Sequence, residues 1–188
     1  MTRAKFLISL APAVSAAQML MMGEASEGFV SLFNGQDMGH CQGDPAVWKV
    51  ERSLLIGKAE GEIPSSLLWK ESDYGDFELR LELRVRQGAV CVQMRAPGVG
   101  PLGVGVEFAP PDIRWKTNGS PFTVIANQKL GEWGAYRIIS KGANFDFVKD
   151  DIRSTIVAGH VEPRGKLAFI LPAGIRSDIE FRNIRLKL

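Results

Sequence analysis

The chain has 188 residues, of which 45% are hydrophobic and 23% charged, with 23 Lys and Arg against 21 Asp and Glu. This length suits one domain with a full core, and these fractions are those of a soluble globular protein. The nearly balanced charge argues against a nucleic-acid or anionic-membrane partner. The 20 Gly and 10 Pro along the chain predict frequent turns, which favours β over α structure.

The first 25 residues have the pattern of an export signal. Arg3 and Lys5 form a basic start, and an apolar stretch, Phe6–Met22, follows. Small residues allow cleavage near Ala16 or after Ala25, and we prefer Ala25 because it leaves a folded domain that can begin soon afterwards. The alternative is an uncleaved membrane anchor, since about 17 apolar residues lie at the short limit for a span.

We therefore predict a signal peptide over residues 1–25 and a single domain over residues 26–188, secreted or located in the periplasm or cell envelope. The membrane is expected as a partner only if the signal segment stays uncleaved. Without Arg3, Lys5 and Glu24 the remaining chain is still almost neutral.

The clearest periodic segment is Phe77–Val85. Its odd positions are apolar and its even positions alternate acid and base. This pattern predicts a strand with one buried face, whose outward Glu78, Arg80, Glu82 and Arg84 can pair with charges on neighbouring strands.

Further strands are expected at short intervals, and turn residues separate them. The expected ranges are Trp48–Val50, Leu54–Ile56, Leu67–Trp69, Val90–Arg95, Val104–Phe108, Tyr136–Ser140, Phe145–Val148, Lys166–Leu171 and Ile179–Lys187. In the last range the apolar phase changes near Arg182 and Asn183, which predicts a β-bulge. Many short strands without a convincing helix indicate an all-β fold, a two-sheet antiparallel β-sandwich of the jelly-roll kind.

Cysteine and histidine are scarce. Cys41 and Cys91 could form one disulfide in an oxidising compartment, but two thiols are too few for a framework or a zinc site. His40 and His160 are the two histidines, and His160 is expected in a solvated loop. We expect no metal and no cofactor, and this composition argues against most hydrolase mechanisms.

Two neighbouring strands carry the candidate site. If residues 90–95 and 103–108 form a hairpin, Gln93 lies opposite Gly105, and Cys91 lies opposite Glu107, on the face turned away from the core. Glycine within a strand destabilises it and is accepted where a ligand or another strand comes close to the backbone. The alternative is a bulge or bend with solvated charges.

A saccharide on this glycine floor would contact Gln93 and Arg95, and Glu107 is the candidate catalytic base. Trp115 is the candidate stacking platform, in a loop above the face, although a Trp packed beneath the loop is an equal alternative. Glycosidases need two carboxyl groups about 5 to 9.5 Å apart. Glu78 and Glu82 share a strand face about 13 Å apart and do not fit, whereas Glu107 with Asp112 stays open.

Five segments in chain order carry a family resemblance. They are 29–37 (FVSLFNGQD), Trp48–Glu51 with 55–57, 74–80 (YGDFELR), 131–133 with Tyr136 and 141–142, and 180–186 (EFRNIRL). Together they resemble the 3-keto-disaccharide hydrolase domain family, over nearly all of the chain from Gly28. The resemblance implies a concanavalin A-like lectin or glucanase jelly roll, often exported, that acts on glycosides whose sugar carries a ketone.

A ketone acidifies the neighbouring C–H, so such a bond can break by proton abstraction and elimination followed by hydration. The chain departs from the family pattern where the family has Gly-Asn-Ser-Gly and Gln-Asp-His-Gly. Here those positions read Gly88-Ala89-Val90-Cys91 and Leu171-Pro172-Ala173-Gly174. We expect the protein to bind a keto-glycoside and, as the resemblance implies, to hydrolyse it. The alternative is a non-catalytic carbohydrate-binding or envelope adhesion or assembly module.

Overall fold

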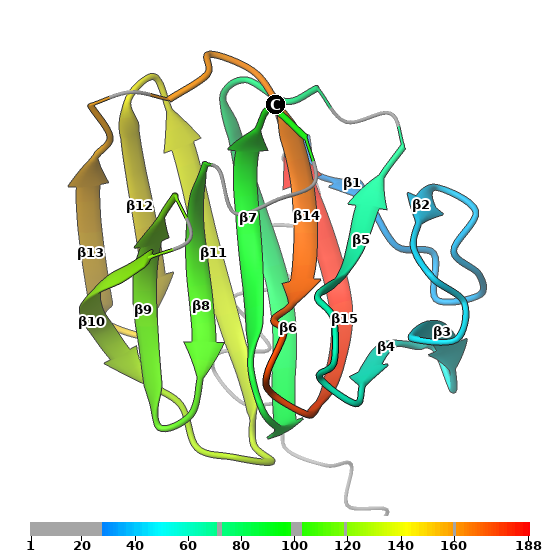
Figure 1. Ribbon diagram of the computed structural model, residues 1–188. Helices are drawn as coiled ribbons and strands as arrows, with labels where there is room; N and C mark the ends of the chain where they lie inside the picture. Colours follow the sequence, from blue (N-terminus) through cyan, green and yellow to red (C-terminus); the bar gives the residue numbers. More distant parts are fainter. Residues whose placement is uncertain (1–27, 71–72, 99–102, 119, 160) are drawn as a thin grey trace, which may run out of the picture.

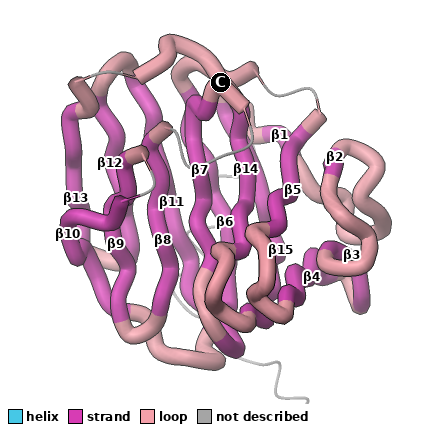
Figure 2. Tube along the Cα trace, in the orientation of Figure 1, coloured by secondary structure: helices cyan, strands magenta, loops and turns pink. Residues whose placement is uncertain are grey.

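The computed structural model describes residues 28–70, 73–98, 103–118, 120–159 and 161–188. In these ranges the chain forms strands, turns and loops and no helix (Figure 2). The strands are β1 (Val30–Ser31), β2 (Cys41–Gln42), β3 (Trp48–Glu51), β4 (Leu54–Ala59), β5 (Ser65–Trp69), β6 (Phe77–Gln87), β7 (Val90–Ala96), β8 (Val104–Ala109), β9 (Asp112–Thr117), β10 (Ser120–Asn127), β11 (Trp133–Lys141), β12 (Asn144–Lys149), β13 (Ile152–Val157), β14 (Lys166–Leu171) and β15 (Ser177–Lys187).

The strands form two sheets that pack face to face (Figure 1). An eight-stranded sheet has the order β13-β12-β11-β6-β15-β4-β3, with β1 paired to β15. A seven-stranded sheet has the order β10-β9-β8-β7-β14-β5-β2 and lies in front in Figure 1. Neighbouring strands pair antiparallel in both, so the predicted two-sheet antiparallel β-sandwich of the jelly-roll kind is confirmed.

Strand β6 has the predicted alternation. Its apolar residues are buried between the sheets, and its charged residues point outward. Glu78 pairs with Arg137 of β11 at 2.9 Å, and Glu82 pairs with Arg182 of β15 at 2.7 Å. The expectation that outward charges of β6 pair across strands is confirmed, with a contribution of a few tenths of a kcal/mol per pair.

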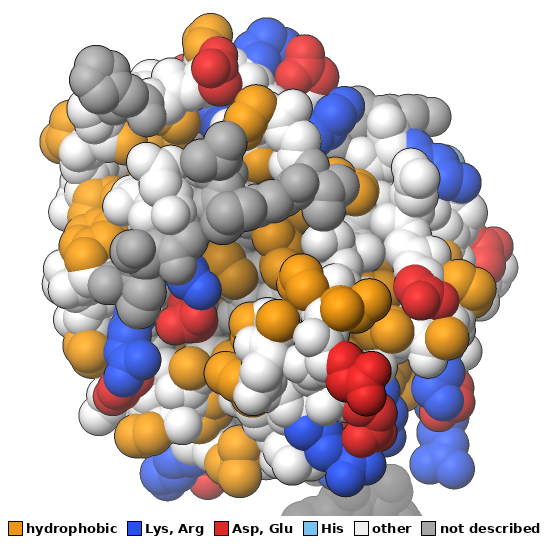
Figure 3. Space-filling model, in the orientation of Figure 1, with side chains coloured by type: hydrophobic (Ala, Val, Ile, Leu, Met, Phe, Trp, Pro, Cys, Tyr) orange, Lys and Arg blue, Asp and Glu red, His pale blue; other side chains and the backbone are white. Residues whose placement is uncertain are grey.

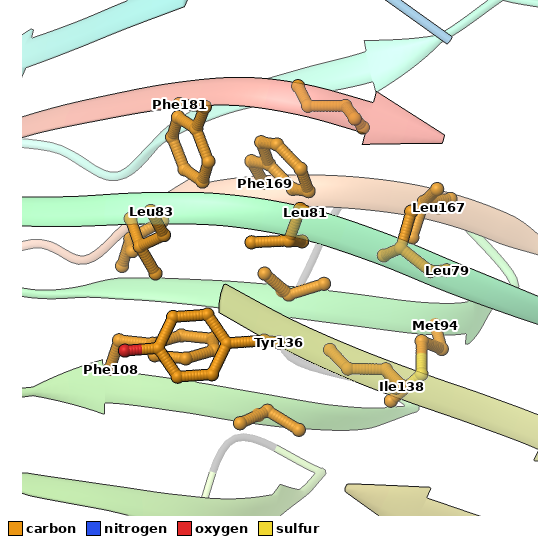
Figure 4. Packing of buried hydrophobic residues seen from close by; sticks show 14 of the residues in the cluster. Leu79, Leu81, Leu83, Met94, Phe108, Tyr136, Ile138, Leu167, Phe169 and Phe181 are labelled. Carbon is orange, nitrogen blue, oxygen red and sulfur yellow. The ribbon is translucent and has the colours of Figure 1, made fainter. Parts of the chain in front are cut away.

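Aromatic contacts join the two layers across the core (Figure 4). Phe169 of β14 stacks on Phe181 of β15 with ring centres 4.3 Å apart, and Phe108 of β8 meets Tyr136 of β11 edge-on at 4.8 Å. Each pair contains one ring from each sheet. Such contacts add roughly 0.5 to 1.5 kcal/mol beyond the burial of their area, so they fix how the sheets sit on one another.

The expected β7–β8 hairpin forms with the expected register. Cys91 pairs with Glu107 and Gln93 pairs with Gly105. The ladder ends at Met94 and Val104, so Arg95 and Gly103, the next two residues opposite each other in this register, do not pair. Arg95 has a φ of 48°, and this left-handed backbone interrupts the alternation of side chains at the end of β7.

Five strands lie outside the predicted set of elements, and two of them, β1 and β2, have only two residues each. The segment around Trp115, expected as a loop, is strand β9, and β10 and β13 form the outer edges of the two sheets. The predicted bulge in β15 is confirmed, because its pairing with β6 shifts between Arg182 and Arg185, and Asn183 has a φ of 52°.

The predicted signal peptide and His160 lie outside the described residues. Within the described ranges, no helix is long and apolar enough to cross a membrane.

Candidate functional site

The candidate site lies on the outer face of the seven-stranded sheet, the face that points away from the other sheet. Strand pairing places outward side chains of five strands in two neighbouring rows across this face. One row holds Leu68, Ala168, Gln93, Gly105 and Lys116, and the other holds Ser66, Ile170, Cys91, Glu107 and Arg114. Small or uncharged side chains therefore form the centre of the outer face, with Glu107, Lys116 and Arg114 toward β9.

Glu107 and Lys116 form an ion pair on this face. Lys116 Nζ donates to Glu107 Oε1 at 2.7 Å, and their side chains are only 19% and 12% exposed. In Figure 3, which views the outer face, acidic and basic side chains meet over β8 and β9 in a surface that is otherwise mostly apolar or uncharged. Little water covers the pair, so solvent screens the charges of Glu107 and Lys116 less than it screens the charges of a fully exposed ion pair.

Cys91 and Gly105 fit together beside this pair. A Cβ atom on Gly105 would lie 2.7 Å from Cys91 Sγ, so glycine is needed for the sulfur of the neighbouring strand. Of the two explanations for a glycine inside this strand, close approach of another strand is the one observed. Gly103, with a φ of 114°, precedes β8 rather than lying within it.

The Cys91 thiol is held neutral. Burial raises its pKa to about 12; the nearby Lys116 charge opposes this shift and the Glu107 charge adds to it. A neutral thiol is a poor nucleophile, so Cys91 belongs to the floor of the outer face rather than to its chemistry. Cys41 and Cys91 are both free thiols in the structure.

Gln93 lies where the hairpin register predicts. It is buried in the row between Ala168 and Gly105, next to the Glu107–Lys116 pair. The structure thus brings Gln93 and Glu107 together on one face.

Arg95 does not have the predicted role of a saccharide contact. Its guanidinium donates to Gly75 O at 2.9 Å, to Gly142 O at 2.5 Å and to Asp76 Oδ1 at 2.7 Å, and it lies over the ring of Phe145. The side chain is buried, and the left-handed backbone at Arg95 turns it away from the outer face. It ties together the segment before β6 and the β11–β12 turn instead of contacting a ligand.

Trp115 does not have the predicted role of a stacking platform in a loop above the face. It lies on the core side of β9 with 0% exposure, its Nε1 donates to Ser154 Oγ at 3.0 Å, and it meets Phe147 edge-on. A buried indole offers no open ring to a sugar, so Trp115 supports the core and is not a stacking platform.

Sequence reasoning missed Lys116 and Arg114. The signal that could have found them is the alternation of apolar and charged residues in this segment. Ile113 and Trp115 face the core, so Arg114 and Lys116 must lie on the opposite face. Asp112, the other carboxylate considered with Glu107, pairs with Arg114 at 2.5 Å. Across the described ranges no group of three or more His, Cys, Asp or Glu side chains is placed to hold a metal ion.

The family model of the 3-keto-alpha-glucoside-1,2-lyase-like domain matches residues 28–187. The chain belongs to this family. The resemblance read from the five segments is therefore confirmed, and no curated protein matches the chain.

Solved structures that the fold resembles come from carbohydrate-active proteins. A candidate glycosyl hydrolase from Parabacteroides distasonis has a TM-score of 0.68 at 16% identity, over 88% of this chain and 95% of that chain. A family 66 carbohydrate-binding module from Bacillus subtilis has a TM-score of 0.65 at 15% identity, over 80% and 97%. A β-glucanase from Bacillus licheniformis has a TM-score of 0.61 at 13% identity, over 87% and 99%. At these identities the likeness shows a shared jelly-roll fold.

Proposed function

We propose that the outer face of the seven-stranded sheet binds a saccharide and that Glu107 and Lys116 cleave a glycoside whose sugar carries a ketone. The observation that carries this proposal is the partly buried Glu107–Lys116 pair, which sets a base beside a cation on a floor of small residues. Membership of the lyase-like family and the carbohydrate-active neighbours support it.

Elimination needs only one carboxylate on this face. Hydrolysis by acid and base needs two carboxyl groups, whereas the two carboxylates near this face, Glu107 and Asp112, are each paired with a cation. Elimination next to a ketone needs one base for the acidified proton and one positive group for the enolate oxygen. Glu107 and Lys116 supply these two groups.

In the proposed reaction Glu107 takes the proton from the carbon between the ketone and the anomeric carbon. The electron pair of that C–H bond moves into the enolate, whose oxygen is stabilised by the Lys116 ammonium. The enolate then expels the aglycone oxygen from the anomeric carbon, and the proton on Glu107 passes to that oxygen. The products are an unsaturated keto sugar and a free alcohol, and addition of water to the double bond gives the free keto sugar.

The test is exchange of the acidic sugar proton with solvent deuterium, followed by NMR on 3-keto disaccharides. The wild-type protein is expected to exchange this proton and to release the alcohol. In Glu107→Gln the rates of both steps are expected to fall by about a hundredfold or more. Glu82→Gln is the matched control, because Glu82 is also ion-paired but lies on the other sheet. Equal rates in Glu107→Gln and wild type would overturn the role of Glu107.

A second function, saccharide binding without cleavage, is favoured by a specific observation. The positions where the family has an acid and an imidazole hold Pro172 and Ala173 in this chain. In that case the wild-type protein would bind keto and unoxidised disaccharides alike, with no exchange and no release. Export from the cell also remains our proposal, and it rests on the sequence of residues 1–25.

A further inference from the structure

A pocket, called the end pocket below, lies at the end of the sandwich where the β8–β9 turn, the β10–β11 loop and the β12–β13 turn meet (lower end in Figure 1). Its volume of about 760 Å³ is in the range of small-molecule sites. Pro110, Pro111, Leu130 and Trp133 give it apolar walls. It lies apart from the outer face, and none of the residues of the two rows there lines it.

Two polar side chains of this end pocket are buried without partners. Among the residues that the structure describes, none forms a hydrogen bond with the Nε2 or the Oε1 of Gln128, or with the hydroxyl of Tyr136. Gln128 is 5% exposed and Tyr136 is 1% exposed. Buried polar atoms are rarely left unpaired in folded proteins, since an apolar residue of similar shape costs less. Two such residues meet at this one pocket, which favours a polar partner that binds there.

The local structure holds both groups in place. The Tyr136 ring packs on Phe108, and Figure 4 shows its oxygen pointing along the core beside that ring. A Cβ atom on Gly134 would lie 2.0 Å from this oxygen, so glycine makes the room that the hydroxyl occupies. The backbone N–H of Gln128 donates to Pro111 O at 2.9 Å, which fixes Gln128 at the start of the β10–β11 loop.

The charges of the end pocket favour a neutral ligand. Lys149 is paired with Asp150 at 3.0 Å, and Lys129 with Glu132 at 3.5 Å. These cations are already balanced by neighbours. Burial also raises the pKa of Tyr136, so its hydroxyl stays a neutral donor.

We propose that the end pocket binds a neutral pyranose, whose hydroxyl groups pair with the Gln128 amide and the Tyr136 hydroxyl. A pyranose ring presents C–H faces to apolar walls and hydroxyls that both donate and accept. The amide offers two donors and one acceptor, which matches vicinal hydroxyls. Burial shields the amide and the hydroxyl from bulk water, so a ligand that reaches them gains their hydrogen bonds at little desolvation cost.

The test is titration of the ¹⁵N-labelled protein with methyl α-glucopyranoside, methyl α-mannopyranoside and methyl β-galactopyranoside. At least one pyranoside is expected to shift the amide resonances of Gly131 and Gly134. Gln128→Met and Tyr136→Phe are each expected to weaken that binding by about tenfold. Gln87→Met, which changes an exposed glutamine at the end of β6, is expected to leave the affinity unchanged.

Thermal unfolding of the same variants separates a ligand site from a structural polar network. If the groups await a ligand, Gln128→Met and Tyr136→Phe keep or raise the Tm of the free protein. A lower Tm in both variants, with no pyranoside shifting Gly131 or Gly134, would assign the groups to ordered water and overturn the proposal. Shifts confined to Gly105 would also overturn it, while supporting a saccharide on the outer face.

Discussion

Lys116 of β9 and Glu107 of β8 are joined diagonally across two neighbouring strands, with Nζ and Oε1 2.7 Å apart. The direct cross-strand partner of Glu107 is Arg114, and that of Lys116 is Gly105. Gly105 has no side chain and Cys91 Sγ lies in the space beside it, while Arg114 turns to Asp112. The pair therefore depends on the residues around it as well as on its own two charges.

Removing the cation is expected to destabilise the fold. Lys116→Met leaves the Glu107 carboxylate largely shielded from water without its partner, which we expect to lower the free energy of unfolding by about 1 to 3 kcal/mol. Urea unfolding followed by Trp fluorescence measures this change. Lys58→Met is the control, because Lys58 pairs with Asp178 but is largely exposed, and its loss is expected to cost under about 1 kcal/mol. Equal effects of the two substitutions would contradict the importance of burial for the Glu107–Lys116 pair.

Gly105 and Cys91 are expected to be coupled. Gly105→Ala places a methyl group against Cys91 Sγ, which we expect to destabilise the protein by about 1 to 3 kcal/mol. The same change in a Cys91→Ala background removes the sulfur and should cost clearly less, because the remaining close atom is Val92 O at 3.1 Å. A double-mutant cycle on unfolding free energies measures the difference. Additive effects would show that the sulfur is not what excludes a side chain at position 105.

The layered β fold could be read from the sequence because a strand with one buried face has a period of two, and in β6 the apolar residues keep that period from Phe77 to Val85. The register of the β7–β8 hairpin followed from matching the buried faces of its two strands. Trp115 was misplaced because β9 is short and follows Pro110 and Pro111, so its alternation looked like a loop.

The candidate site was less accessible to sequence reasoning. The orientation of Arg95 depends on a left-handed backbone and on carbonyls of Gly75 and Gly142, which lie far from it in the chain. Local pattern cannot supply such contacts. Glu107 and Gln93 were placed on the right face by the hairpin alone, but Lys116 became visible only once β9 was known as a strand.

Asp76 is expected to make stability depend on pH. Its Oδ1 accepts a hydrogen bond from Gly142 N at 2.8 Å and another from Arg95, and these bonds, the first most of all, hold the pKa of Asp76 below its ordinary value. A lowered pKa in the folded state gives stability that is present above the unfolded value, near pH 4, and is lost as the pH falls through the folded value.

Asp76→Asn should therefore lower stability at neutral pH and flatten the decline of the unfolding free energy below about pH 4. Urea unfolding over a pH series measures both effects. Asp151→Asn, at an exposed position in the β12–β13 turn, serves as the control and should change neither. The same slope in wild type and Asp76→Asn would exclude this carboxylate as the source.

The most direct measurement of the central claim is release of free sugar from a panel of 3-keto and unoxidised disaccharides by wild-type protein, Glu107→Gln and Lys116→Met. We predict turnover of the keto substrates by the wild-type protein, and a rate at least about a hundredfold lower in Glu107→Gln. Turnover in Glu107→Gln at the wild-type rate, or the absence of both turnover and saccharide binding in the wild-type protein, would contradict a reactive site on the outer face.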